Sequence, residues 1–144
     1  MKSITEIQNQ IVENFELFEG DMESTLFYLM DLGKKLPPMD EALKTEANIV
    51  KGCQSKVWLN AKLEKGKVIF EADSNTEITK GLISLLIQVW NNQTPEDILN
   101  SELFFIEKIG MSRMIGGQRS NGFASMIKQM KMYALAFKSM GHGA

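Results

Sequence analysis

The sequence contains very little cysteine, histidine or proline. Its 144 residues include one cysteine, Cys53, one histidine and three prolines. A disulfide needs two thiols, and zinc or iron–sulfur sites built from protein thiolates normally need three or four, so one cysteine excludes these structures within a single chain. We therefore expect no metal and no cofactor in this chain, and any chemistry of the sulfur must use one thiol alone.

The scarcity of histidine argues against hydrolysis. A cysteine hydrolase needs a base beside its nucleophile, and that base is usually histidine. The only histidine, His142, lies in the glycine-flanked segment 141–144, where disorder is the default for a chain end. We expect a flexible tail over about residues 139–144 and no hydrolase activity. A peroxidase that uses one cysteine and an outside reductant stays open as a remote third alternative.

Long apolar runs and an excess of one charge are missing too. The chain has 16 Lys and Arg against 18 Asp and Glu, a formal net charge of −2. Such a chain has no electrostatic excess with which to bind phosphate backbones, so we expect no nucleic-acid partner. No apolar run approaches the roughly 18 residues of a membrane span, and the first residues lack the apolar core of a signal peptide. We expect a cytoplasmic protein without a membrane partner.

Hydrophobic residues recur at spacings of three and four along much of the chain, which predicts helices. The length and the 44% hydrophobic content are typical of one globular domain, which we expect over residues 1–144. Capping residues place the helix starts. The expected helices begin at Ser3, Asp21, Ser74, Thr94 and about Arg119, and the last one continues to about Met140. Inside the third, Gly81 costs about 1 kcal/mol relative to alanine, so we expect it to mark a close crossing with another element.

Two segments alternate between apolar and polar residues, as half-buried strands do. They cover residues 57–64 and 68–72, and Lys65-Gly66 supplies a turn between them, so they predict an antiparallel hairpin. Two strands alone are marginally stable, so the sheet must pack against the helices. The fold class is therefore predicted as α+β, with an irregular segment over residues 36–52 that includes one helical turn near Glu41.

Cys53 comes just before the first predicted strand, and two interpretations of it are open. A free cysteine usually behaves as a small buried hydrophobe, and composition alone favours that interpretation. Its neighbours favour a reactive thiol on a loop, because Gly52 permits a tight turn and Lys51, Gln54 and Ser55 are polar. Lys51 and the local amides would favour the thiolate, so we predict a Cys53 pKa below the unperturbed value of roughly 8.5.

Several short motifs follow one another in a defined order along the chain. The central motif is 50–55 followed by 57–59, the second is 72–74 with 80–82, and the third is 119–122. Together with Leu36-Pro37-Pro38 and the stretch 45–48, this ordered set resembles the SufE family of sulfur-acceptor proteins over essentially residues 5–138. Each tetrapeptide alone is unspecific, whereas the ordered set is specific.

The resemblance implies an α+β fold similar to that of the IscU-type scaffold proteins. Its small antiparallel sheet would have about three strands and would be packed by flanking helices, with the reactive cysteine on a loop beside the sheet. The third strand would lie between Leu103 and Ile109, where the sequence shows no clean period.

The resemblance also implies a function, that of a sulfur acceptor and carrier in iron–sulfur cluster assembly. Cys53 would take persulfide sulfur from a SufS-like cysteine desulfurase, stimulate that enzyme and pass the sulfur to a SufBCD-like scaffold complex. The chain would be a sulfurtransferase-type carrier without independent turnover, as a monomer or weak homodimer. Pyridoxal phosphate would belong to the partner desulfurase.

Further candidate site residues follow from the same resemblance. Arg119 matches the family's arginine at the start of the last helix, where it would stabilise a thiolate or persulfide or contact the partner. A surface ion pair is an equally weighted alternative for Arg119. Lys51, Gly52, Gln54 and Asp73 are expected to support the loop or the partner contact, although a carboxylate placed like that of Asp73 is usually a helix cap.

One departure from the family and two alternative functions complete the prediction. Many members have a Ser/Thr-Pro pair shortly before the arginine, whereas this chain has Gly116-Gly117-Gln118, so we expect a loosely held approach to Arg119. The chain could instead be a binding partner that activates a desulfurase allosterically without using Cys53. It could also be a paralogue that feeds a different sulfur acceptor.

Overall fold

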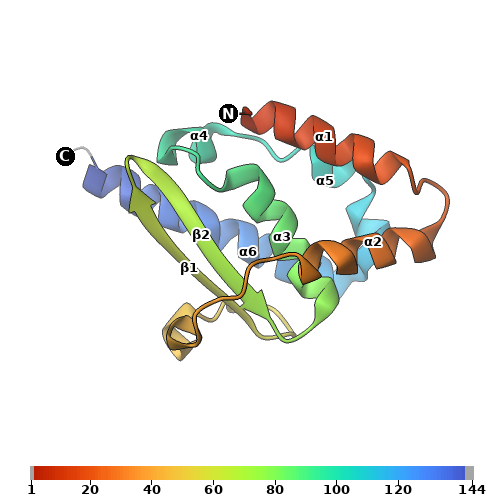
Figure 1. The fold of residues 1–144 in the computed structure, drawn as a ribbon, viewed down its shortest axis with the longest axis horizontal. Helices are drawn as coiled ribbons and strands as arrows, with labels where there is room; N and C mark the ends of the chain where they lie inside the picture. The colour runs from red at the N-terminus through yellow and green to blue at the C-terminus, as the bar shows by residue number, and fades with distance from the viewer. Residues whose placement is uncertain (1, 142–144) are drawn as a thin grey trace.

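The computed structural model describes residues 2–141 as an α+β protein (Figure 1), which confirms the predicted fold class. The elements in chain order are α1 Ile4–Glu16, α2 Met22–Lys34, the short 3₁₀ helices η1 Glu41–Leu43 and η2 Glu46–Asn48, β1 Val57–Glu64, β2 Lys67–Ser74, α3 Glu77–Trp90, α4 Pro95–Asn100, α5 Phe105–Lys108 and α6 Met111–Gly141. Residues 139–141 form the end of α6 rather than part of a flexible tail, whereas His142 and residues 143–144 lie outside the described residues.

Capping side chains start the helices largely as predicted. The Ser3 hydroxyl accepts from the Glu6 N–H at 3.1 Å, and Glu6 accepts in turn from the Ser3 N–H. Asp21 caps α2 and Thr94 caps α4. The capping box predicted at Ser74 is wrong, because Ser74 ends β2 and its hydroxyl donates to the Lys56 carbonyl, so α3 begins after Thr76 instead.

The two strands form an antiparallel hairpin in which Val57 lies opposite Ser74 and Glu64 opposite Lys67. The turn residues Lys65 and Gly66 both have positive φ, as a two-residue hairpin turn with the native strand twist requires. Alternate residues of β2 are buried, and this face packs on α3.

The third strand predicted between Leu103 and Ile109 is wrong. Within residues 2–141 the sheet has two strands, and residues 105–108 form α5. The Phe105 side chain is fully buried, and its N–H donates to the side chain of Gln8 in α1. Tertiary packing against α1 therefore determines this segment, whose sequence has no period of its own.

The central helix is α3, which contacts α1, α2, α6 and β2 (Figure 1). It crosses α2 closely where Gly81 faces Leu29 and Gly33. A Cβ at Gly81 would overlap the Leu29 carbonyl oxygen, and one at Gly33 would lie 2.7 Å from the Gly81 nitrogen. The prediction that Gly81 marks a close crossing is confirmed.

The last helix, α6, is interrupted at Gly116. This residue has φ 77° and ψ 175°, a conformation outside the helical region that glycine adopts easily. A helical turn over residues 111–115 precedes the break, and Met111 and Ile115 anchor that turn in the core. The long part of α6 follows the break, close to the predicted start at Arg119.

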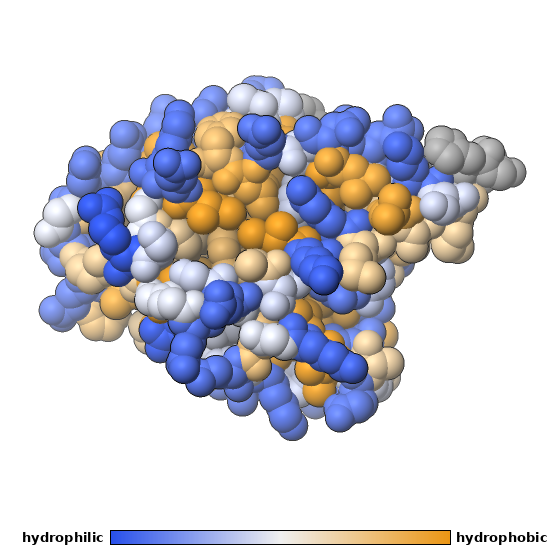
Figure 2. Space-filling model, turned by 180° about the vertical axis from the view of Figure 1, so that it is seen from behind, coloured by the Kyte–Doolittle hydropathy of each residue, from blue (hydrophilic) through white to orange (hydrophobic). Residues whose placement is uncertain are grey.

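Most hydrophobic side chains lie inside, and α6 carries several that do not. Figure 2 shows the molecule from behind, where hydrophobic side chains form a band bordered by hydrophilic ones. The exposed large hydrophobic residues of α6 are Met132, Leu135 and Met140. No helix in residues 2–141 has the length and apolar character needed to cross a membrane.

Candidate functional site around Cys53

The Cys53 loop comprises residues 51–56, and hydrogen bonds at its ends hold it in place. The Val50 N–H donates to the Val57 carbonyl at 2.8 Å, and both valines are buried. Lys56 donates through its N–H to the Asn75 side chain and accepts from the Asn75 N–H. The loop is therefore short, with fixed ends.

Gly52 allows this loop to approach α6. Its φ is +97°, a conformation that disfavours any side chain. A Cβ at this position would also lie 2.5 Å from the hydroxyl oxygen of Ser125 in α6. Both the backbone conformation and the contact with α6 require glycine.

Cys53 is half-buried, and its side chain lies against α6. Its thiol donates to the Gly122 carbonyl oxygen at 3.4 Å, and Gly122 is 69 positions away in the sequence. Burial raises the pKa of the Cys53 thiol, so the prediction of a lowered pKa is wrong. The polar neighbours in the sequence do not decide the environment of the sulfur, because α6, which is distant in the sequence, covers it in the fold.

The thiol opens into a pocket of about 100 Å³ where three segments meet. The loop contributes Cys53, Gln54 and Ser55, α3 contributes Thr79 and Leu82, and α6 contributes Gln118, Arg119, Gly122 and Met126. The structure thus brings together three of the predicted site residues, namely Cys53, Gln54 and Arg119. Gly52 lets the loop lie against Ser125 of α6 without lining the pocket, and Lys51 is exposed and does not line it either.

Arg119 lies at the rim of this pocket with an exposed side chain. Within residues 2–141 it forms no ion pair with a carboxylate. The alternative of a surface ion pair therefore finds no partner in the described part of the chain. Arg119 thus brings a positive charge, without a carboxylate partner among the described residues, to the rim of the pocket that Cys53 lines.

Asp73 connects elements around the loop but does not line the pocket. Its carboxylate lies 2.7 Å from the Lys44 ammonium and 3.3 Å from that of Lys80, and it accepts from the Ser74 N–H. Burial opposes ionisation of Asp73, but the hydrogen bonds from Lys44 and Ser74 and the charge of Lys80 outweigh it, so its pKa is lowered. Asp73 thus ties β2 to the segment before the Cys53 loop and to α3, and it caps no helix.

Three hydroxyl groups beside the pocket were not predicted from the sequence as part of the site. The Thr76 hydroxyl donates to that of Thr79 at 2.8 Å, the Thr79 hydroxyl donates to that of Ser55 at 3.3 Å, and Ser55 and Thr76 are 3.1 Å apart. We refer to Ser55, Thr76 and Thr79 as the hydroxyl ring. Their spacing in the sequence has no signature, because Ser55 comes from the loop and the threonines from the start of α3.

Other lining residues also escaped prediction as site residues. Gly122 stands in the third family motif and was available as a signal, as was Gln118 beside Arg119. Leu82 and Met126 have the spacing of ordinary core positions, and both are buried.

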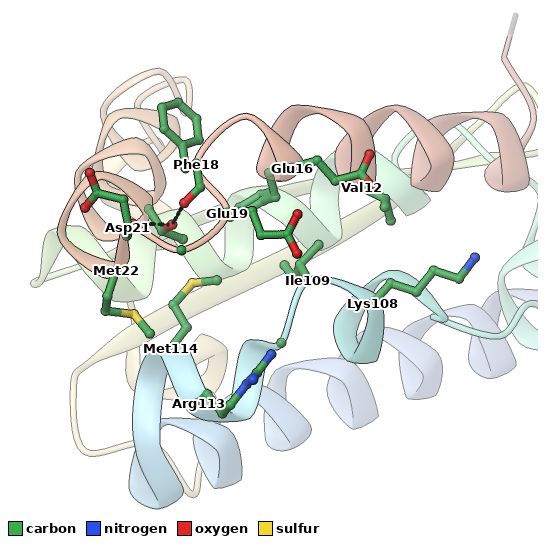
Figure 3. A pocket seen from close by; sticks show the side chains of 14 residues that line it. Val12, Glu16, Phe18, Glu19, Asp21, Met22, Lys108, Ile109, Arg113 and Met114 are labelled. Carbon is green, nitrogen blue, oxygen red and sulfur yellow. Dashed lines mark hydrogen bonds between the residues drawn. The ribbon is translucent and has the colours of Figure 1, made fainter.

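A larger cavity lies elsewhere, between the α1–α2 turn and the α5–α6 turn (Figure 3). Its volume is about 480 Å³, and it shares no lining residue with the Cys53 pocket. Glu19 and Arg113 point into it from opposite sides, and Met22 and Met114 also line it (Figure 3). It contains no thiol, so it does not contribute to the chemistry of Cys53.

No three His, Cys, Asp or Glu side chains within residues 2–141 are placed to hold a metal ion.

The fold and site define a class of protein, a small α+β domain with one half-buried thiol on a loop between its sheet and its last helix. Residues 9–134 match the family model of SufE, described as an Fe–S metabolism associated domain. A SufE-like protein of Synechocystis, itself uncharacterized, is 41% identical over 137 residues, which is 93% of this chain and 86% of that protein. The chain belongs to the SufE family, as its motifs predicted, and this membership indicates a role in iron–sulfur metabolism and sulfur transfer.

Two further similarities concern the compartment and the fold. SufE-like protein 1, chloroplastic/mitochondrial, of Arabidopsis thaliana is 34% identical over 144 residues, which is 98% of this chain but 39% of that longer protein. Since that relative is named for organelles, the cytoplasmic location of this chain stays a prediction. The solution structure of a hypothetical protein from Thermus thermophilus has the same fold, with a TM-score of 0.76 over 92% of this chain and 96% of that one at 20% identity.

Proposed function

We propose that this chain is a sulfur acceptor and carrier. In this proposal Cys53 receives persulfide sulfur from a cysteine desulfurase, stimulates that enzyme by removing its product, and passes the sulfur to an iron–sulfur scaffold complex. The observation that carries the proposal is the single thiol of a SufE-family chain, placed at the wall of a pocket with Arg119 at its rim. The pyridoxal phosphate that desulfuration requires would be supplied by the desulfurase.

The proposed transfer is a thiol exchange at sulfur. The Cys53 thiolate attacks the outer sulfur of the desulfurase cysteine persulfide. The sulfur–sulfur bond of the donor breaks as a new one forms on Cys53, and the desulfurase cysteine leaves as a thiolate that takes up a proton. One thiol and one persulfide become one persulfide and one thiol, so the step needs no outside oxidant or reductant.

The solitary thiol suits a carrier. A second cysteine nearby would attack the inner sulfur of the Cys53 persulfide, form a disulfide and release the outer sulfur as sulfide. The chain has no second cysteine. The buried side chains of Leu82 and Met126 in the pocket wall would also limit the access of water and small thiols.

The raised pKa of Cys53 sets a condition on the transfer. Because burial raises the pKa of this thiol, the free protein holds Cys53 mainly as the neutral thiol near neutral pH. Deprotonation would then accompany docking, when the sulfur leaves the Gly122 carbonyl and meets the donor. Arg119 would favour the anionic forms of Cys53 through its positive charge.

Intact-protein mass spectrometry tests the proposal directly. The chain is incubated with a cysteine desulfurase and L-cysteine, and a gain of about 32 Da per sulfur, located at Cys53 and lost on reduction, is expected. The Cys53→Ser variant is the matched control and should gain nothing and fail to stimulate the desulfurase. Full stimulation by this variant would refute the carrier function and leave an allosteric activator.

A further inference from the structure

Thr76 occupies the N-cap position of α3, yet its hydroxyl does not cap the helix. An N-cap threonine ordinarily accepts a hydrogen bond from the N–H two or three residues on, and this bond stabilises the helix start. Here the hydroxyl instead takes part in the hydroxyl ring with Thr79 and Ser55. The start of α3 therefore forgoes a local stabilising bond in favour of a contact with the Cys53 loop, and such exceptions to local rules concentrate at functional sites.

The hydroxyl ring is closed, and each member gives one proton and receives one. Thr76 donates to Thr79 and Thr79 donates to Ser55, so the remaining proton, that of Ser55, is directed to Thr76. Hydrogen bonds in such a chain polarise and strengthen one another. Thr79 is only 6% exposed, so the loss of its hydroxyl would remove two of the three bonds at a buried position.

The hydroxyl ring also connects the Cys53 loop to α3 through side chains. Ser55 is two residues from Cys53, and both Ser55 and Thr79 line the pocket of the thiol. The hydrogen bond from Cys53 to α6 joins its thiol to the Gly122 carbonyl at 3.4 Å, and a thiol is a weak donor. Hydroxyl bonds are stronger, so the hydroxyl ring has more influence on the loop position than the cysteine itself.

We propose that Thr79 is a positioning residue that controls, through the hydroxyl ring, how often Cys53 leaves its site at Gly122. While the ring is intact, Ser55 is held on α3 and the sulfur stays against α6. When the ring opens, the Cys53 loop gains freedom and the thiol becomes accessible. The importance of this exposure for sulfur acceptance rests on the proposed function, whereas the exposure itself does not.

The test compares variants of Thr79 that keep or lose the hydroxyl. Thr79→Val has nearly the same shape without the hydroxyl, and Thr79→Ser restores it. Thr25→Val is the matched control, because the Thr25 hydroxyl donates to the backbone carbonyls of Phe18 and Asp21 in the turn before α2, away from the Cys53 pocket. If Thr79→Val does not fold, Ser55→Ala opens the hydroxyl ring from the loop side.

The readout is the rate at which iodoacetamide alkylates Cys53 in the isolated, folded protein over a pH series. Thr79→Val removes one of the two hydrogen bonds between Ser55 and the start of α3, and it should react about fivefold faster than the original chain, which is the change in an opening equilibrium that one neutral hydrogen bond represents. Ser55→Ala removes both bonds and should react at least as fast as Thr79→Val. The apparent pKa of Cys53 in these variants should also fall towards the ordinary value, because an open loop relieves burial. Thr79→Ser and Thr25→Val should react like the original chain.

Failure of this proposal and failure of the proposed function are distinguishable. Absence of the gain of about 32 Da in the original chain would refute sulfur acceptance and would leave the alkylation result intact. The positioning role is overturned if Thr79→Val and Ser55→Ala alkylate at the original rate and pH profile, or if Thr25→Val accelerates alkylation as much as they do.

Discussion

Substitution Gly52→Ala should destabilise the protein and displace the Cys53 loop from α6. The reason is that the new methyl group meets two separate obstacles. The backbone of Gly52 has φ +97°, where an L-residue clashes with its own carbonyl groups. The added Cβ would also lie 2.5 Å from the Ser125 hydroxyl oxygen, well inside van der Waals contact.

The two obstacles make separate contributions to the loss of folding free energy. The left-handed backbone costs an alanine about 1–2 kcal/mol. The overlap adds about 1–3 kcal/mol, the usual cost of forcing an extra methyl group into an occupied space. Ser125→Ala removes the overlapping oxygen and leaves a Cβ at 3.4 Å from the new methyl, which is ordinary contact. The double variant should therefore regain the free energy lost to the overlap and still show the cost of the left-handed backbone.

Urea denaturation of the four proteins gives the free energies of unfolding for a double-mutant cycle. Ser125→Ala alone should be nearly neutral, since its hydroxyl donates only to the Asn121 carbonyl in the same helix. Alkylation of Cys53 should accelerate in Gly52→Ala and return towards the original rate in the double variant. A Gly52→Ala protein within about 0.5 kcal/mol of the original, or effects that simply add, would refute the reasoning.

Three further substitutions give expected outcomes at other positions. Arg119→Ala should slow the mass gain of the chain while the free energy of unfolding changes by less than about 0.5 kcal/mol, since the side chain is exposed; an unchanged rate with a lowered melting temperature would return Arg119 to a structural role. The lowered pKa of Asp73 means that its ionised form stabilises the fold above the unfolded pKa and that this contribution is lost as pH falls through the folded pKa. Asp73→Asn should therefore be less stable at neutral pH and show a shallower loss of stability below about pH 4 in acid denaturation; an unchanged acid profile would contradict this. Gly81→Ala should cost more than about 2 kcal/mol, because its methyl would overlap the Leu29 carbonyl oxygen, whereas the control Gly117→Ala, with open space around it, should be neutral or stabilising in the same urea assay.

Local patterns predicted most of the fold because the residues that interact in them are close together in the sequence. The capping box at Ser3 and the cap at Asp21 each depend on side chains within three residues of one another. The alternation through residues 57–72 depends on one buried face of one hairpin. Gly81 was informative because an unfavourable residue in a helix interior needs a compensating contact.

The wrong predictions concern segments whose structure depends on contacts between residues far apart in the sequence. The segment 103–109 becomes helical over 105–108 because Phe105 is buried and bonded to Gln8, 97 positions away. The Ser74 to Glu77 spacing imitates a capping box, but the Ser74 hydroxyl is engaged by Lys56 from the other side of the hairpin.

The candidate site was predicted in part for the same reason. Cys53 was identified because it is the only cysteine and precedes a predicted strand, Arg119 was identified because a family motif contains it, and both line one pocket. The environment of the sulfur was misjudged, because its polar neighbour Lys51 is exposed to solvent while Gly122 covers the thiol. The hydroxyl ring could not be predicted from the sequence, since Ser55 and Thr79 are brought together only by folding.

The bond between Cys53 and Gly122 also has a consequence for the order of folding. It joins residues 69 positions apart, and contacts of such separation must overcome a large loop-closure entropy before they form. The hairpin and the separate helices can form earlier from local contacts, while the sulfur is still uncovered. Protection of the thiol by Gly122 is thus acquired only when α6 docks, so the rate at which Cys53 becomes protected from alkylation during refolding reports the docking of α6.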